Sequence, residues 1–179
     1  MNRQQSLIET NLRWLEQARR LVERLDDRTY STSPRGFEPH RAGGHMRHVL
    51  EFYDCFLNGL PSGYVDYDAR RRDAHIETSC VEAAQRIDRV AGRLQSGELD
   101  GDDMGVMVRI EDADRMPVMG AWMPSSVSRE LQVLASHTIH HFALIAMTLR
   151  AHGVEVDPAF GVAPATLSYA KGTNRKAAA

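Results

Sequence analysis

The sequence of 179 residues is poor in lysine and cysteine and has no long apolar run. Lysine occurs only at Lys171 and Lys176, and the arginines are dispersed along the chain, so no concentrated basic field indicates a nucleic-acid partner. No stretch approaches the ~18 uninterrupted apolar residues of a membrane-spanning helix, and the first residues do not form an apolar signal core. We therefore expect a cytoplasmic protein that binds neither nucleic acid nor a membrane.

The sequence also lacks the common nucleophile motifs. The two cysteines, Cys55 and Cys80, form no Cys-x-x-Cys motif and lie in segments with helical spacing, so a disulfide framework is not expected. Gly-x-Ser-x-Gly is absent, and no residue pattern indicates a base that would activate Cys55. No catalytic acid, base or nucleophile of the chain can be assigned from sequence.

Four segments repeat apolar residues at the spacing of an amphipathic helix, namely residues 7–25, 45–60, 68–94 and 126–150. Gly, Pro and Asp mark the connections at 26–44 and 95–124, and residues 63–67 are expected to form a short turn. This pattern predicts an all-α fold, a four-helix bundle, within a single domain covering residues 1–170. Residues 171–179 are expected to form a disordered tail.

A short stretch between the third and fourth predicted helices has a different period. Val106, Val108 and Ile110 alternate with Met107 and Arg109, and a second apolar stretch follows at residues 117–122. Alternation with a period of two is typical of a half-buried strand. The sequence therefore predicts a small β-hairpin inserted between helices three and four.

Histidine is concentrated in two of the predicted helices. The fourth contains His137, His140 and His141, of which the first and last are one helical turn apart and share a face in the most apolar segment of the chain. Two buried imidazoles without partners would cost roughly 1 to 3 kcal/mol each. A shared metal ion would relieve that cost, because neutral imidazole is a common metal ligand.

The second predicted helix adds His45 and His48, and His48 shares its face with Phe52 and Cys55. Helices in a bundle pack roughly 8 to 10 Å apart, a gap that two opposed imidazoles can span through a metal ion. His48, His137 and His141 would form a tri-histidine site with an open coordination position, as in catalytic zinc centres. The alternative is a set of hydrogen-bonded core histidines. Glu51, one turn beyond His48, is expected to be exposed, and the alternative is that it supports the metal ligands.

The order of these motifs resembles that of the DinB-like family of metal-binding four-helix bundles. The resemblance depends on Gly44-His-Met-Arg-His48-Val-Leu, on His137-Thr-Ile-His-His141 and on the closing Phe160-Gly-Val-Ala-Pro-Ala-Thr-Leu-Ser-Tyr169, and it covers about residues 5 to 169. It implies a bacterial protein with an up-down-down-up bundle, possible homodimerisation and one divalent metal ion, zinc or nickel, with iron or manganese as further candidates. Because aliphatic residues follow the helix-two ligand in the family, the resemblance favours His48 over His45. It leaves His140 outside the metal site.

An open tri-histidine centre can lower the pKa of bound water to about 7 or bind and activate a thiolate. In the resembled family, thiol-dependent transfer and isomerisation are known, and hydrolysis has been proposed. We therefore expect an enzyme, a thiol-dependent S-transferase that joins a low-molecular-weight thiol to a small electrophile. The alternatives are a metal-dependent hydrolase, a non-catalytic metal-binding protein associated with stress, and a bundle in which the histidines only stabilise the fold.

Overall fold

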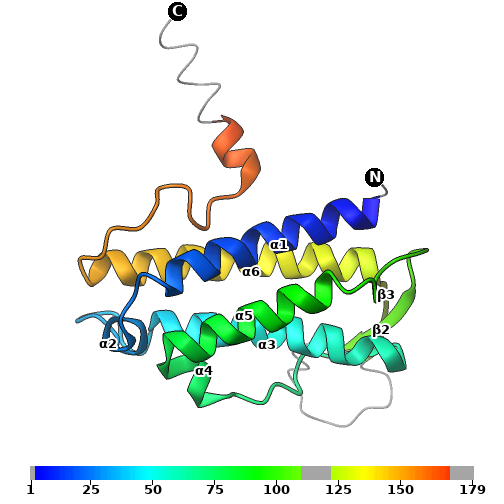
Figure 1. Ribbon diagram of the computed structural model, residues 1–179, viewed down its shortest axis with the longest axis horizontal. Helices are drawn as coiled ribbons and strands as arrows, with labels where there is room; N and C mark the ends of the chain where they lie inside the picture. The colour runs from blue at the N-terminus through cyan, green and yellow to red at the C-terminus, as the bar shows by residue number, and fades with distance from the viewer. Residues whose placement is uncertain (1–2, 110–121, 170–179) are drawn as a thin grey trace, which may run out of the picture.

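The computed structural model describes residues 3–109 and 122–169, and most of them are helical (Figure 1). The long helices are α1 (Arg3–Val22), α3 (Ala42–Gly59), α5 (Cys80–Leu94) and α6 (Val127–Ala151). Both α1 and α3 contact α5 and α6, so the four helices surround a common core. In Figure 1, α1 and α6 run in one direction, and α3 and α5 run in the opposite direction. No helix in the described part of the chain is both long and apolar enough to cross a bilayer.

The ends of α6 agree with the sequence prediction. The helix begins directly after Ser126, whose hydroxyl accepts a hydrogen bond from the backbone N–H of Arg129 at 3.3 Å. It ends shortly before Gly153, which has a φ of +79°, a conformation that favours glycine. The local chemistry at both ends therefore determines where this helix starts and stops.

The predicted third helix, residues 68–94, was wrong in its first part. The structure has a non-helical segment up to Asp73, then the short helix α4 (Ala74–Thr78) and finally α5. Both Asp73 and Ser79 have extended backbone angles, and their side chains accept hydrogen bonds from backbone N–H groups of the helix that follows. Each residue therefore starts a new helix, which divides the apolar pattern.

Two shorter elements were not predicted. Within the expected loop at 26–44, α2 (Asp27–Ser31) is capped by Asp26, which accepts a 2.9 Å hydrogen bond from the Thr29 N–H. A single 3-10 turn, η1 (Leu60–Ser62), follows α3. These elements have five and three residues, too few to show a helical period in the sequence.

The predicted hairpin is present in the described residues as β2 (Gly105–Arg109) paired antiparallel with β3 (Met123–Ser126). The second strand follows the expected stretch at 117–122, most of which lies outside the described residues, as does Ile110. The expected turn at 63–67 is instead β1 (Tyr64–Asp66), which pairs in parallel with β2. Three residues are too few to show a strand period, so only the tertiary pairing defines β1.

Apolar side chains from all the long helices fill the core. Leu15 and Val22 of α1 are almost fully buried within the chain, so the apolar stripe of α1 faces the interior. At the other end of the sequence, Phe160 stacks on Phe142 of α6 with ring centroids 4.7 Å apart. The predicted tail at 171–179 lies outside the described residues.

One buried polar network links three of the long helices. Tyr53 of α3 donates a hydrogen bond to Asn11 Oδ1 of α1 at 2.7 Å, and its hydroxyl lies 3.2 Å from Thr138 Oγ1 of α6. Asn11 Nδ2 donates to the backbone carbonyl of Leu131 at 3.0 Å. Because Tyr53, Asn11 and Thr138 are fully buried, each polar atom depends on these partners, and the network holds α6 in register with α1 and α3.

Replacing Tyr53 by phenylalanine should lower the free energy of unfolding by about 1 to 3 kcal/mol, because Asn11 Oδ1 would lose its buried donor. Urea unfolding followed by circular dichroism measures this change. Tyr64→Phe serves as a matched control, because Tyr64 is 52% exposed, and should change stability by less than about 0.5 kcal/mol. Equal effects of the two substitutions would contradict a stabilising role for the network.

Candidate metal centre

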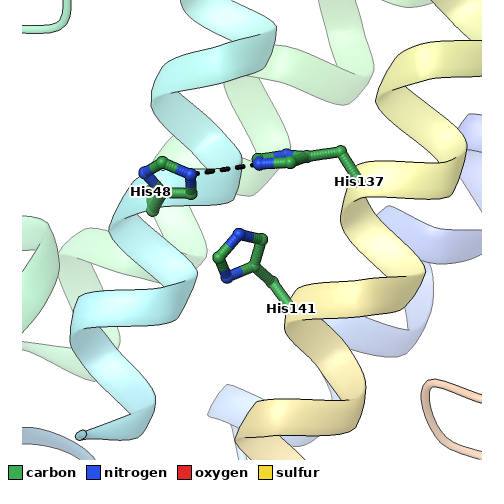
Figure 2. A group of neighbouring side chains, drawn as sticks. All are labelled: His48, His137 and His141. Carbon is green, nitrogen blue, oxygen red and sulfur yellow. Dashed lines mark hydrogen bonds between the residues drawn. The ribbon is translucent and has the colours of Figure 1, made fainter. Parts of the chain in front are cut away.

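The structure brings together the three histidines that the sequence predicts as metal ligands (Figure 2). His48 projects from α3 towards His137 and His141 of α6, and its Nε2 lies 3.0 Å from His137 Nε2. One ring nitrogen from each residue lies within 4.8 Å of those of the other two. The three side chains are therefore close enough to bind one metal ion.

The packing of α3 against α6 explains why these rings meet. The three histidines are partly buried, and each is followed by a buried residue: Val49 after His48, Thr138 after His137 and Phe142 after His141. The Phe52 ring lies against His137 with centroids 4.0 Å apart and an angle of 24°. The imidazoles therefore lie at the edge of the apolar core, not in open solvent.

Burial also keeps the three rings neutral. Burial, reinforced by the charge of Arg70, lowers the pKa of His48 to about 3. Burial lowers the pKa of His137 to about 4 and that of His141 to about 2, and neighbouring histidines add to the effect on His141. Near neutral pH each ring is therefore neutral and keeps one unprotonated nitrogen. In His48 that nitrogen is Nδ1, which accepts from Arg70, so a metal ion at Nε2 would have to displace the Nε2 proton and this Arg70 contact.

The unsatisfied polar atoms of the site fit a metal ion. His137 Nδ1 is buried and makes no hydrogen bond, and His137 Nε2 faces another imidazole nitrogen instead of a carboxylate or carbonyl oxygen. Buried imidazoles gain little from one another, whereas a shared cation would bind their lone pairs. Three imidazoles suit several first-row divalent ions, including zinc and nickel.

His45 lies closer to the centre than the sequence indicated. Its Nδ1 is 3.1 Å from His141 Nδ1, so one of these two rings donates to the other. If His141 is the donor, its Nε2 is left unprotonated for a metal ion. The i, i+3 spacing of His45 and His48 places both on one face of α3 and could have revealed this role. His140, by contrast, is exposed, and only its ring edge approaches His141.

Arg70 is a site residue that sequence reasoning missed. Its guanidinium donates to His48 Nδ1 and lies 5.3 Å from the centre of the Phe52 ring. Arg70 belongs to the non-helical segment that precedes α4. No periodic pattern marks such a residue, so only the tertiary structure could show that it lies against the histidines.

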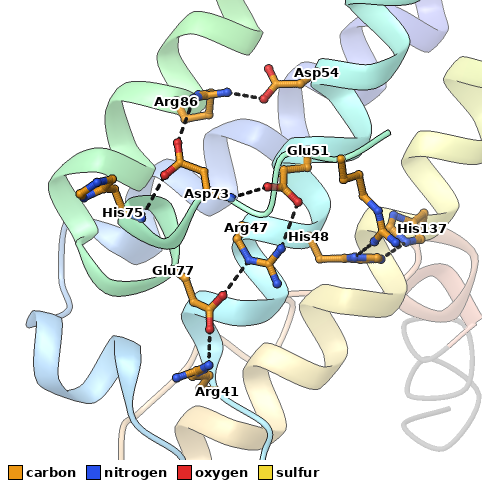
Figure 3. Close-up of polar contacts among 11 residues, drawn as sticks. Arg41, Arg47, His48, Glu51, Asp54, Asp73, His75, Glu77, Arg86 and His137 are labelled. Carbon is orange, nitrogen blue, oxygen red and sulfur yellow. Dashed lines mark hydrogen bonds and ion pairs between the residues drawn. The ribbon is translucent and has the colours of Figure 1, made fainter. Parts of the chain in front are cut away.

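A network of charged side chains holds the segment that contains Arg70 against α3 (Figure 3). Glu51, expected to be exposed, is in fact 3% exposed and accepts hydrogen bonds from the Asp73 N–H at 2.8 Å and from Arg47 at 3.1 Å. Arg47 also pairs with Glu77 of α4 at 2.7 Å. The prediction for Glu51 was wrong because the folded-back segment covers a position that α3 alone would leave exposed.

Comparisons of the chain with protein-family models, with curated proteins and with solved structures found no match.

Purified protein should contain about one divalent transition metal ion per chain, because the described residues form one histidine cluster of this kind. His137→Ala or His141→Ala should remove most of the metal, as measured by inductively coupled plasma mass spectrometry after dialysis. His140→Ala is the matched control and should retain it. Equal metal content in the three variants would refute the assignment.

His45→Ala tests the contact between His45 and His141 separately. We expect metal affinity to fall by about 10-fold to 100-fold, because partners of metal ligands orient the ligand without binding the ion. A competition titration with a chromophoric chelator measures this affinity. Complete loss of metal in His45→Ala together with normal binding in His48→Ala would mean that His45, and not His48, is the ligand from α3.

The metal-free protein should lose stability as the pH falls. His141 has a pKa of about 2 in the folded protein and an ordinary value of 6.5, so the unfolded chain binds more protons between these values. The contribution of neutral His141 to stability is therefore complete above pH 6.5 and is lost as the pH falls towards the folded-state pKa. In His141→Gln, the free energy of unfolding should depend less steeply on pH. The decrease in slope should be smaller than about 1.4 kcal/mol per pH unit, the limit for one proton.

Urea unfolding of chelator-treated protein at several pH values between 7 and 4 measures this difference. The difference between the two slopes reports the proton uptake of His141 together with its effect on the neighbouring His45, His48 and His137. Identical slopes would show that His141 titrates normally in the folded chain.

Proposed function

We propose that this chain is a metal-dependent enzyme that transfers a low-molecular-weight thiol to a small electrophile, with His48, His137 and His141 holding one divalent ion. The observation that carries the proposal is the convergence of three partly buried imidazoles from two helices on one point. A zinc or nickel ion suits this donor set. Three protein ligands leave a coordination position for a reactant, unlike the four of a closed structural zinc site.

The arrangement of the helices supports a DinB-like four-helix bundle of the up-down-down-up type. The long helices α1 and α6 run together, against α3 and α5 (Figure 1). The contacts α1–α5, α5–α3, α3–α6 and α6–α1 form a closed ring. Strands β2 and β3 lie in the connection between α5 and α6, where the hairpin insertion was expected, and β1 joins them in one sheet.

The cysteines of the chain are poor nucleophiles, which favours a nucleophile supplied by a ligand. Burial raises the pKa of the Cys55 thiol to about 11 and that of Cys80 to about 12, so both are protonated near neutral pH. A divalent ion in this centre would supply a Lewis acid that lowers the pKa of an incoming thiol. Phe52 covers one side of His137 and limits access of water to that ring.

The proposed reaction balances without an oxidant or reductant. The incoming thiol loses its proton, its sulfur forms a bond to the electrophilic carbon, and the leaving group departs with the electron pair of the broken bond and takes up a proton. The three neutral imidazoles would hold the ion without adding negative charge, so the loaded centre would be cationic and would favour an anionic sulfur.

Metal-loaded protein should consume thiol in the presence of 1-chloro-2,4-dinitrobenzene, with release of chloride. Glutathione, cysteine, bacillithiol and mycothiol form the panel, and thiol loss is followed spectroscopically. Removing a residue that hydrogen-bonds to a metal ligand commonly lowers metal affinity or activity by 10-fold to 100-fold. Removing the ligand itself in His48→Ala should therefore lower the rate by at least about 100-fold. His140→Ala is the control and should keep the rate.

Equal rates in the metal-loaded protein and His48→Ala for every thiol would refute thiol transfer. Hydrolysis of ester or amide substrates, lost in His48→Ala, would then identify the protein as a metal-dependent hydrolase. Failure of those substrates as well would favour the non-catalytic metal-binding protein.

A further inference from the structure

A cleft of about 630 Å³ lies between α3, α5 and the segment from Tyr64 to Asp73. Its walls are rich in arginine and acidic residues, and Arg70 belongs to them. The same Arg70 side chain donates to His48 Nδ1. One residue therefore connects the cleft to the predicted metal ligands.

The arginines of this cleft differ in their partners. Arg86 pairs with Asp54 and with Asp73, and Arg93 pairs with Glu98. No carboxylate among the described residues forms a salt bridge with Arg70, whose guanidinium donates to a neutral imidazole and lies over an aromatic ring. Its Nε is buried and makes no hydrogen bond. Arg70 is thus a partly buried cation with unused donors.

This arrangement favours an anionic ligand. A partly buried guanidinium is costly without an acceptor for its N–H groups. Nε and a neighbouring amino group form a planar fork that matches the two oxygens of a carboxylate. The exposed Arg71 and Arg89 also line the cleft and raise its positive potential.

We infer that the cleft binds a small molecule through a carboxylate, and that Arg70 anchors this group next to His48. The inference deepens the proposed function, because it names the substrate class as a thiol or electrophile that bears a carboxylate a few bonds from its reacting atom. Glu51 is the positioning residue, since it accepts from the Asp73 N–H and so holds the Arg70 segment against α3.

Two matched thiols test the inference on metal-free protein, so that the result does not depend on activity. At pH 7, 3-mercaptopropionate carries a carboxylate and 2-mercaptoethanol does not. In ¹⁵N-labelled protein the first should shift the Arg70 Nε–H resonance and the second should not. Arg70→Gln should raise the dissociation constant of 3-mercaptopropionate by about 10-fold or more, the effect of losing a charged hydrogen bond.

Two further variants separate recognition from folding and from overall charge. Arg70→Lys keeps the charge without the fork and should recover part of the affinity. Arg150→Gln removes one positive charge from an exposed position on α6 and should bind like the unmodified chain. Unchanged binding of 3-mercaptopropionate in a folded Arg70→Gln variant, or equal binding of the two thiols, would overturn the inference.

Cobalt-loaded protein distinguishes this result from failure of the proposed function. Binding of a thiol to Co²⁺ produces a new near-ultraviolet absorption band. If both thiols produce the band with equal affinity, Arg70 does not bind the carboxylate, but the binding of thiols to the metal centre is supported. A carboxylate preference in the metal-free protein, with no band for either thiol, supports the carboxylate site and refutes thiol transfer.

Discussion

The candidate site depends on the packing of α3 against α6. This contact brings His48 within hydrogen-bonding distance of His137. It also buries the rings enough to keep them neutral, because a charged imidazole would lose its hydration there. The same packing therefore brings the rings together and keeps them uncharged, two conditions for binding a metal ion. Without the partner helix, each histidine would be an ordinary exposed side chain.

Two polar networks on either side of this contact stabilise it. Asn11, Tyr53 and Thr138 satisfy one another inside the core, and so restrict sliding of α6 relative to α1 and α3. On the other side, Glu51 and Arg47 hold the segment before α4, and α4 itself, against α3. A close approach assists this docking, because a Cβ atom on Gly43 would lie 2.0 Å from the backbone oxygen of Glu77. Glycine at this position lets α4 lie directly on α3.

The fold connects two groups that can bind different parts of one ligand, the imidazole cluster and the arginines of the cleft. Neutral imidazoles lie at the edge of the apolar core, and Arg70 links them to a cleft whose walls carry arginines with and without acidic partners. Both cysteines have raised pKa values and cannot supply a thiolate near neutral pH. A ligand with a soft nucleophile at one end and a carboxylate at the other would complement both features, since the ion would take the first group and Arg70 the second.

The sequence alone indicated the long helices, the first strand of the hairpin and the concentration of histidines in two helices, because each depends on a repeated spacing. Residues one turn apart share a helix face whatever packs against it, so His137 and His141 could be paired in advance. The break in the predicted third helix depended instead on capping by Asp73 and Ser79, which competes with an otherwise helical pattern. Only the tertiary structure decided the burial of Glu51, the contact of Arg70 with His48 and the pairing of β1 with β2. Those features join segments that are distant in sequence or too short to show a period, and their stability comes from contacts that no local pattern encodes.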